Sequence, residues 1–228
     1  KAQGVKSVAI VYMDDLFGLE NFAALNAALK GTNIEVVERK SYPLGVKDLS
    51  PVLRAIKDRN PDAFIGITYP PDTILASKQS KEVGFNPKFF YASVGTAFQL
   101  YKNVLGENVD GVMGMGSWNA KTSPGAKAYF DAHVARWKKE PDRWASGHCW
   151  AGLEILQQSV AKVGLNRKAI RDHIAATEFE TIIGKVKFKG SEISVPGSVS
   201  QWNGGDFEVV WPKSMATSKV VAPKPDWK

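Results

Sequence analysis

Short apolar runs alternate with segments of helical periodicity over the first half of the chain. The apolar run at residues 8–11 leads through a loop into Phe22, Leu25 and Leu29, which recur at helical spacing. Such an unbroken run is typical of a strand that is covered on both faces. Further strands are predicted at residues 33–42 (nearer a sheet edge), 63–69, 88–93 and 110–118, and helices at residues 19–30, 51–59 (with Ser50 as N-cap), 70–84 and 96–105. This alternation predicts a doubly wound α/β lobe with a parallel sheet and right-handed crossovers.

The pattern changes after residue 118. Helices are predicted from residue 123, after residue 142 and from Asn166, which is a favourable N-cap. A strand is predicted at residues 181–190, and two more at 199–202 and 207–211 flank a Gly-Gly turn, which is a strong hairpin signal. These helices have few strands of their own, so we expect their apolar faces to pack on a partner elsewhere. Residues 212–228 hold four lysines and three prolines and are predicted to form an extended, partly ordered tail.

Composition narrows the class of protein. The 228 residues are 44% hydrophobic and 23% charged, as in an ordinary globular protein, and no apolar run approaches the roughly 18–20 residues that span a bilayer. The net charge of +7 comes from lysines and arginines dispersed along the chain, without a nucleic-acid-binding motif, so we expect no nucleic-acid partner. Lys1 lies a few residues before a predicted core strand, without a signal peptide or an initiating Met, which favours a mature or truncated product.

The candidate chemistry is sparse. Asp14 and Asp15 end the first strand, but a Mg²⁺-dependent phosphoacceptor site also needs an Asp after the third strand and a Lys after the fifth, and neither is present. The chain holds no G-x-G-x-x-G fingerprint, phosphate loop or G-x-S-x-G elbow, and its three histidines are not at metal-ligand spacing. Cys149, the single cysteine, falls on a predicted apolar face and is expected to be a buried structural thiol. The sequence therefore predicts no metal and no cofactor, and it disfavours an enzyme.

Aromatic and small polar residues follow the predicted strands. These residues are Phe17, Tyr69, Ser93 and Trp118. In open α/β sheets ligands bind outside the carboxyl ends of the strands, so these side chains are expected to share one rim. The sequence thus predicts a concave site for a small molecule.

Eight short motifs occur in a telling order: V-A-I-V-Y (8–12), D-D-L-F-G (14–18), K-D-L-S-P-V-L (47–53), N-P-D-A-F-I (60–65), E-V-G (82–84), W-A-G-L (150–153), G-K-V-K-F (184–188) and V-S-Q-W-N-G-G (199–205). In this order the chain resembles the type I periplasmic binding proteins, specifically the leucine/isoleucine/valine-binding family. The resemblance implies a solute-binding protein that captures a ligand between two α/β lobes by hinge closure and delivers it to the membrane permease of an ABC importer. It also implies a location in the periplasm, or outside the cytoplasm on a lipid anchor.

The resemblance also implies a division of the chain. Residues 1–119 would form lobe two, residues 120–195 the C-terminal, mostly helical part of lobe one, and residues 196–228 the crossover back with the hairpin and tail. The first part of lobe one would be missing, including the serine/threonine loop that holds the ligand carboxylate in such proteins. We then expect exposed apolar helix faces, which would bind the missing half or a second copy of the chain.

Site residues follow from the resemblance position by position. Phe17 stands where relatives often have tyrosine, Tyr69 matches a ligand-contacting aromatic, and the stretch with Ser93 and Val94 lacks the glutamate that accepts an amino-acid ammonium. Unless Asp15 or Asp72 supplies that charge, the expected ligand is a small carboxylate or amide, including aromatic acids, with an amino acid as the alternative. Trp118 would belong to the same rim as Phe17, Tyr69 and Ser93, and from the other lobe Ser146 or His148, near the N-terminus of the returning helix, would face the cleft.

Two other classes of function stay open. One is a cytoplasmic ligand-sensing regulator built on the same lobes, and the other is an enzyme with its site around Asp14, Asp15 and His148.

Overall fold

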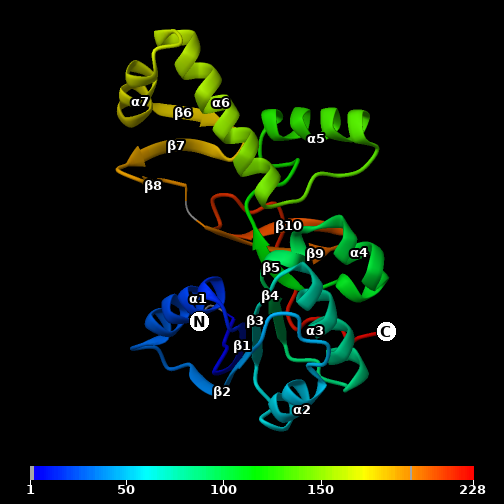
Figure 1. Ribbon diagram of the computed structural model, residues 1–228. Helices are drawn as coiled ribbons and strands as arrows, with labels where there is room; N and C mark the ends of the chain where they lie inside the picture. The colour runs from blue at the N-terminus through cyan, green and yellow to red at the C-terminus, as the bar shows by residue number, and fades with distance from the viewer. Residues whose placement is uncertain (1–2, 196) are drawn as a thin grey trace. The chain divides into compact units, whose positions relative to one another are not determined.

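The computed structural model describes residues 3–195 and 197–228 (Figure 1). The chain divides into two compact units: unit 1 comprises the residues up to 115 with 200–207 and 220–228, and unit 2 comprises 116–199 and 208–219. The first half contains β1 (Ser7–Met13), α1 (Leu16–Leu29), β2 (Glu35–Tyr42), α2 (Ser50–Asp58), β3 (Ala63–Ile67), α3 (Pro70–Glu82), β4 (Phe89–Ala92), the 3₁₀ helix η1 (Val94–Ala97), α4 (Gln99–Leu105), η2 (Gly106–Val109) and β5 (Met113–Gly116). The second half contains α5 (Pro124–Trp137), α6 (Ala145–Val163), α7 (Arg167–Ala176), β6 (Glu178–Thr181), β7 (Gly184–Lys189), β8 (Glu192–Ile193), β9 (Ser198–Asn203) and β10 (Asp206–Trp211).

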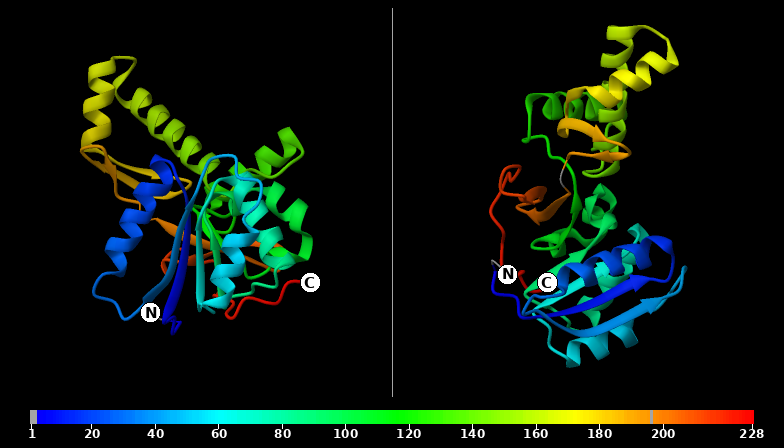
Figure 2. Two further views of the ribbon diagram at one scale, coloured as in Figure 1. Left: turned by 60° about the horizontal axis from the view of Figure 1, so that its bottom comes forward. Right: turned by 90° about the vertical axis from the view of Figure 1, so that its left-hand side faces the viewer.

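A seven-stranded sheet runs in the order β10-β9-β5-β4-β3-β1-β2. The pairs β1–β2, β1–β3, β3–β4 and β4–β5 are parallel, which confirms the predicted doubly wound arrangement. β2 lies at the edge, as its alternating sequence predicted. Helix α1 covers one face of the strands of unit 1, and α2 and α3 cover the other (Figure 2). The carboxyl ends of β1, β3 and β4 therefore share one rim.

Burial explains why these segments fold as they do. Residues 8–11 of β1 are at most 2% exposed, because both faces of this central strand are covered. The predicted helical stripe Phe22, Leu25 and Leu29 packs against Val8 and Ile10 from α1. On α2, Leu53 and Ile56 are buried.

Several element boundaries differ from the predictions in unit 1; α1, for example, begins at Leu16 rather than at residue 19. Helix α2 already includes Ser50, and Leu49 is its N-cap, because Asp48 accepts the backbone N–H of Ser50 at 2.8 Å and so starts the helix earlier. β5 begins only at Met113, since Gly111 adopts a φ of +81° that ends extended pairing. The stretch predicted as one helix from Thr96 is divided into η1 and α4.

The single strand predicted at 181–190 is confirmed only in part, because β7 covers residues 184–189 while Thr181 is the last residue of its antiparallel partner β6. Ile182 and Ile183 make the turn between them and are 3% and 5% exposed, so the core of unit 2 buries two β-branched residues outside any strand. Gly184 has a φ of +102°, which only glycine adopts readily. The hairpin of β9 and β10 is confirmed, with Gly204 and Gly205 both at positive φ in its two-residue turn.

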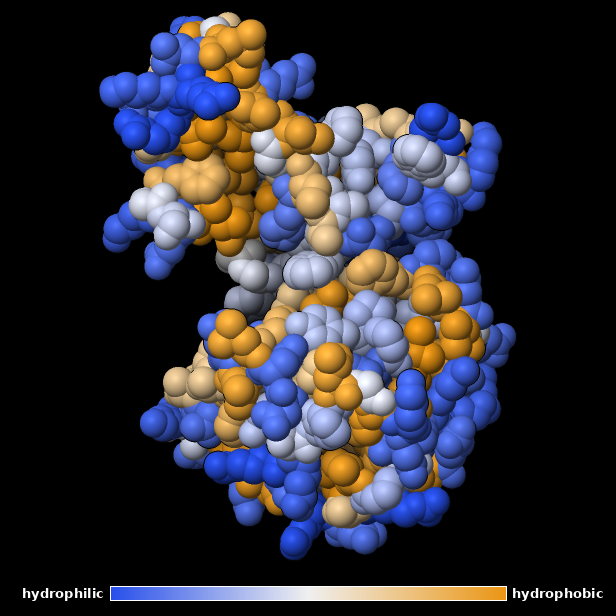
Figure 3. Space-filling view, in the orientation of Figure 1, coloured by the Kyte–Doolittle hydropathy of each residue, from blue (hydrophilic) through white to orange (hydrophobic). Residues whose placement is uncertain are grey.

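Helix α6 buries a different face from the one predicted. Small and branched residues four positions apart form its packed face, namely Gly147, Ala151, Ile155 and Ser159. Cys149 is exposed, so the prediction of a buried structural thiol is wrong. The exposed face also carries Leu153 and Leu156, at 59% and 45% exposure, and hydrophobic surface gathers over α6 in Figure 3. A helix with two apolar faces gives two candidate core stripes, and periodicity alone cannot choose between them.

The C-terminal residues form a strap on unit 1. The Gln201 side chain accepts the backbone N–H of Val221 at 2.8 Å and donates to its carbonyl at 2.8 Å. Trp227 donates its indole N–H to the Phe85 carbonyl at 2.8 Å and meets the Phe90 ring edge-on. The tail is extended as predicted, and these contacts fix its course.

In the described part of the chain, no helix combines the length and apolar character that crossing a membrane requires. Within the same residues, no three His, Cys, Asp or Glu side chains gather into a metal site.

Candidate functional site

The loop after β1 is shaped by a helix cap and a glycine. Asp15 is the N-cap of α1, and its Oδ1 accepts the backbone N–H of Gly18 at 2.8 Å. A Cβ at Gly18 would lie 1.8 Å from the Met13 carbonyl oxygen, so only glycine fits there. The close approach places Phe17, in the first turn of α1, at the rim beside the end of β1.

Phe17 and Tyr69 form an aromatic pair at this rim. Their ring centroids lie 5.0 Å apart with an interplanar angle of 27°, which is a stacked arrangement. The Tyr69 hydroxyl donates to Asp15 Oδ2 at 3.1 Å. Partial burial and this bond to a carboxylate raise the pKa of Tyr69. Both rings are half-buried, so the pair presents an aromatic surface that a ligand can reach.

Ser93 and Val94 lie behind this surface rather than on it. The Ser93 hydroxyl donates to the Thr68 carbonyl and accepts the Thr68 N–H, both at 2.9 Å, which ties the end of β4 to the end of β3. Ser93 and Val94 are 2% and 4% exposed. A Cβ at Gly95 would lie 2.4 Å from Thr73 Oγ1, so η1 packs tightly on the first turn of α3.

A buried acid lies near the same end of the sheet. Asp72 is 6% exposed, and burial raises the pKa of its carboxyl. The Tyr42 hydroxyl donates to it across 3.5 Å, and burial together with Asp72 raises the pKa of Tyr42. Asp72 is thus held inside unit 1, not at the aromatic surface.

In unit 2, Trp118 is a core residue. It is fully buried, and its indole N–H donates to the Asp142 carbonyl at 3.1 Å. A Cβ at Gly147 would lie 2.4 Å from its ring, which explains a glycine in the first turn of α6. Arg143 lies 5.6 Å from the ring centroid, at cation–π distance.

Asp142 occupies the start of α6. Its carboxylate accepts the backbone N–H groups of Trp144 and Ser146, and its carbonyl accepts the Ser146 hydroxyl at 2.6 Å. The positive end of this helix is therefore already neutralised by an acid of the chain itself. His148 is exposed one turn later, with Nδ1 3.1 Å from the Trp144 carbonyl oxygen.

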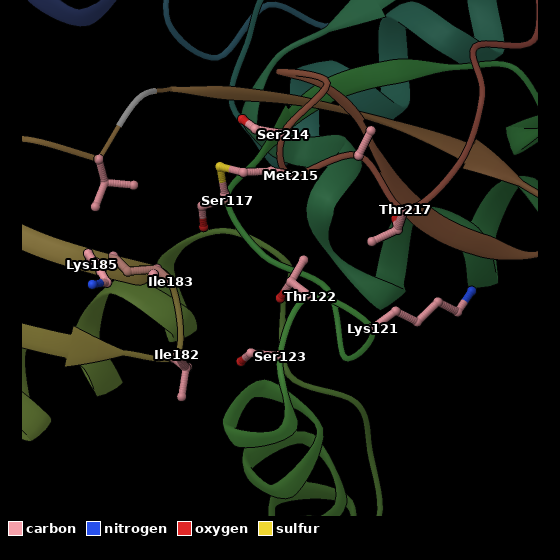
Figure 4. Close-up of a pocket in the computed structure, with 13 residues that line it drawn as sticks. Ser117, Lys121, Thr122, Ser123, Ile182, Ile183, Lys185, Ser214, Met215 and Thr217 are labelled. Carbon is pink, nitrogen blue, oxygen red and sulfur yellow. The ribbon is translucent and has the colours of Figure 1, made fainter.

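A pocket of about 370 Å³ lies within unit 2 (Figure 4). Ser123 at its wall caps α5 by accepting the Ala126 N–H at 3.0 Å. Thr217 donates to Glu208 at 2.5 Å, and Lys121 pairs with the same carboxylate. In Figure 4 the Lys121 ammonium points away from the other labelled side chains. These polar groups of the pocket are therefore engaged in hydrogen bonds and ion pairs within unit 2.

The predicted site residues thus fall into two groups. In unit 1, Phe17 and Tyr69 are in direct contact, and Ser93 and Val94 support the same strand ends. In unit 2, Trp118 and Ser146 are both bonded to Asp142, and His148 lies one turn further on. The roles of Asp142 and of the Asp15–Tyr69 bond were not predicted. The Asp at position 142, before a helix start, was a visible capping signal, whereas nothing in the sequence links residues 15 and 69.

Known proteins resemble this chain in sequence and in fold. The family model described as "Periplasmic binding protein" matches residues 1–206. The Leu/Ile/Val-binding protein homolog 7 of Brucella abortus (strain 2308) is 23% identical over 230 residues, covering 95% of this chain and 58% of the relative. The chain thus spans little more than half of that protein's length.

Two solved structures show the same fold. The leucine-binding protein LivK of Thermotoga maritima matches with a TM-score of 0.76 at 22% identity, covering 92% of this chain and 61% of that chain. An ABC transporter solute-binding protein from R. palustris, in complex with benzoate, matches with a TM-score of 0.81 at 16% identity, covering 99% and 61%. The names of all three proteins are those of binding proteins, not of enzymes. The chain therefore belongs to the periplasmic binding protein family, with the type I fold of its leucine/isoleucine/valine-binding branch.

Proposed function

We propose that the chain acts within an extracytoplasmic solute-binding protein that delivers a small ligand to the permease of an ABC importer. The observation that carries this is the accessible Phe17–Tyr69 pair at the carboxyl ends of β1 and β3, where open α/β sheets bind ligands. We place the protein in the periplasm, or outside the cytoplasm on a lipid anchor.

The proposal assigns the two units to the two lobes of the family. Unit 1 would be lobe two, unit 2 would be the returning part of lobe one, and the predicted borders near residues 119 and 195 stay a proposal. In the whole protein, hinge closure of the lobes would enclose the ligand.

The ligand is proposed to be a small carboxylate, amide or amino-acid-like molecule. The names of the two solved structures mention leucine in one case and benzoate in the other, and both compounds have an apolar body with a carboxylate. Phe17 and Tyr69 would hold that apolar body. Ser93, Val94 and Trp118 would support the binding surface. Ser146 and His148 would be the ligand contacts that unit 2 contributes.

Calorimetric titration with leucine, phenylalanine and benzoate tests this function. We expect binding of at least one compound, weakened about tenfold or more in Tyr69→Ala, because a stacked aromatic contact is lost. Leu44→Ala, at a 79% exposed position of unit 1, serves as the matched control and should bind as the parent does. If the whole protein binds none of the three compounds, or if its Tyr69→Ala variant binds as well as Leu44→Ala, the proposed function is wrong.

A further inference from the structure

The hydroxyl of Tyr69 is bonded to an acid whose position is fixed. Asp15 has an extended backbone (φ −143°, ψ 178°), its carbonyl accepts the Leu19 N–H at 2.9 Å, and its Oδ1 accepts the Gly18 N–H at 2.8 Å. These bonds belong to the start of α1. The second carboxylate oxygen, Oδ2, is thereby aimed at the Tyr69 hydroxyl, 3.1 Å away.

Tyr69 is held equally well from its own side. It is the N-cap of α3, and its carbonyl accepts the Thr73 N–H at 2.8 Å and the Thr73 hydroxyl at 2.9 Å. Its ring stacks on Phe17. The hydroxyl therefore meets Asp15 between two helix starts, and neither partner needs to move to form the bond.

This bond decides what the hydroxyl can offer to a ligand. An ionised carboxylate has only acceptor sites, so the proton in the bond is that of the phenol. Once that proton is directed at Asp15, the phenolic oxygen has only lone pairs left for a further partner. A ligand group that meets Tyr69 must then supply an N–H or an O–H.

The side-chain hydroxyl at the neighbouring strand end is already used as a donor and does not compensate a ligand carboxylate. The Ser93 hydroxyl already donates to the Thr68 carbonyl. Asp14, which is exposed, adds negative charge beside Asp15. The engaged Ser93 hydroxyl and the carboxylate of Asp15 disfavour a ligand carboxylate at this aromatic surface, and the exposed Asp14 adds only weakly to that effect.

We propose that Asp15 is a positioning residue that fixes the Tyr69 hydroxyl as a hydrogen-bond acceptor, so that unit 1 receives the N–H or O–H end of the ligand and rejects a carboxylate. This inference rests on the proposed function and sharpens its substrate class. Amides, alcohols and ammonium compounds fit the end of the ligand that faces unit 1.

The first test needs no ligand. Ultraviolet titration of the chain, minus that of Tyr69→Phe, isolates the ionisation of Tyr69. Asp15→Asn should lower the pKa of Tyr69 toward its ordinary value of about 10, because a carboxylate no longer disfavours the phenolate. Asp14→Asn removes the same charge one residue away and should leave the pKa of Tyr69 nearly unchanged. Asparagine is as good an N-cap as aspartate, so α1 should stay folded in Asp15→Asn.

The second test uses benzamide and benzoate, which share a ring and differ in their hydrogen-bond donors. The parent chain should bind benzamide more tightly. In Asp15→Asn the asparagine side-chain amide can donate a hydrogen bond to the phenolic oxygen of Tyr69. The hydroxyl proton of Tyr69 is then free to point toward the ligand, so the preference for benzamide should fall about tenfold or more. The preference should stay within about twofold in Asp14→Asn, since a single exposed charge interacts weakly.

The outcomes separate this inference from the function on which it rests. An unchanged Tyr69 titration in Asp15→Asn would overturn the inference, whichever probe binds. A shifted titration with benzoate bound as tightly as benzamide would also overturn it, while the binding function stands. A shifted titration with no binding of either probe, or of leucine and phenylalanine, would overturn the proposed function and the selectivity with it.

Discussion

Single residues at the first loop set the geometry of the whole rim. Gly18 lets the start of α1 lie against the last residue of β1, and Asp15 then caps the helix and bonds to Tyr69. The stacked aromatic pair is a consequence of these two contacts. Substitutions in the loop after β1 should therefore change the free energy of unfolding as well as ligand affinity.

Substituting Gly18 by alanine should destabilise unit 1. The new Cβ would lie 1.8 Å from the Met13 carbonyl oxygen, so the backbone must shift, and overpacking of this kind costs about 1–3 kcal/mol. Gly152→Ala is the matched control, because its Cβ meets nothing within 4 Å and helix propensity should add about 0.5–1 kcal/mol of stability. Urea denaturation of both variants measures the difference, and equal midpoints would contradict the close approach.

Asp72 should give stability a distinct pH dependence. Burial raises the pKa of this carboxyl in the folded state, so the folded chain holds the proton more tightly than the unfolded chain. The contribution of Asp72 is fully present below the unfolded pKa and is lost as pH rises through the folded one. Relative to Asp72→Asn, the parent should lose free energy of unfolding as pH rises above about 4, as urea denaturation at several pH values would show.

Asp48 provides the opposite sign as a control. Hydrogen bonds from Ser50 lower the pKa of this exposed carboxyl, so its stabilising contribution is lost as pH falls toward the folded pKa. Relative to Asp48→Asn, the parent should lose stability on acidification. If both pairs of proteins showed the same trend, the assigned surroundings of Asp72 would be wrong.

Among the elements, periodicity predicted the parallel sheet and most of the helices of unit 1. The apolar residues of β1 and α1 allow only one choice of buried face. The burial of residues 8–11 and the packing of Phe22 could therefore be predicted without the structure. The Ile182–Ile183 turn could not be predicted. Two adjacent β-branched residues favour a strand, and only the structure shows that they are buried in the core of unit 2 as a turn. The same holds for Cys149, whose helix has two apolar faces.

The candidate site was predictable to a similar degree and for related reasons. Phe17 and Tyr69 follow strands, and the rule for open α/β sheets finds such positions. The tie between Ser93 and Thr68 is a contact across two neighbouring strands, 25 residues apart in sequence. Contacts of this kind need the register of the strands, which a single sequence does not contain.

The C-terminal strap should contribute strongly to the stability of unit 1. Trp227 packs edge-on against Phe90, bonds to the Phe85 carbonyl and has the Lys224 ammonium 3.5 Å from its ring centroid. Trp227→Ala should lower the free energy of unfolding by about 2–4 kcal/mol, since the ring loses apolar, polar and cation–π partners. Trp137→Ala, at a 56% exposed tryptophan, should change it by less than about 1 kcal/mol. Similar thermal midpoints for the two variants would contradict this account of the strap.

At the scale of the whole molecule, unit 2 carries apolar side chains without cover in the described part of the chain. Trp137 and Trp150 are 56% and 43% exposed and line a groove of about 440 Å³, and Leu153 and Leu156 continue the apolar surface along α6. Exposed apolar patches of this kind favour association. The chain also spans only 58% of its curated relative.

We therefore expect the 228-residue chain to self-associate at micromolar concentration. The double variant Leu153→Ser, Leu156→Ser should reduce the associated fraction, because it removes apolar surface from α6. Leu44→Ser in unit 1, at a position that is 79% exposed, should leave association unchanged. Sedimentation velocity measures all three, and a monodisperse monomer of the parent chain would show that the surface on α6 does not drive association.

The exposure of Cys149 makes this helix a natural place for an optical reporter. Because the sequence holds one thiol and it lies on the surface, a maleimide dye should couple at a single position without prior mutagenesis. That position is next to His148, the exposed residue proposed to represent unit 2 at the ligand. Emission from a polarity-sensitive dye at Cys149 would then convert each binding experiment into a fluorescence titration on the unmodified sequence.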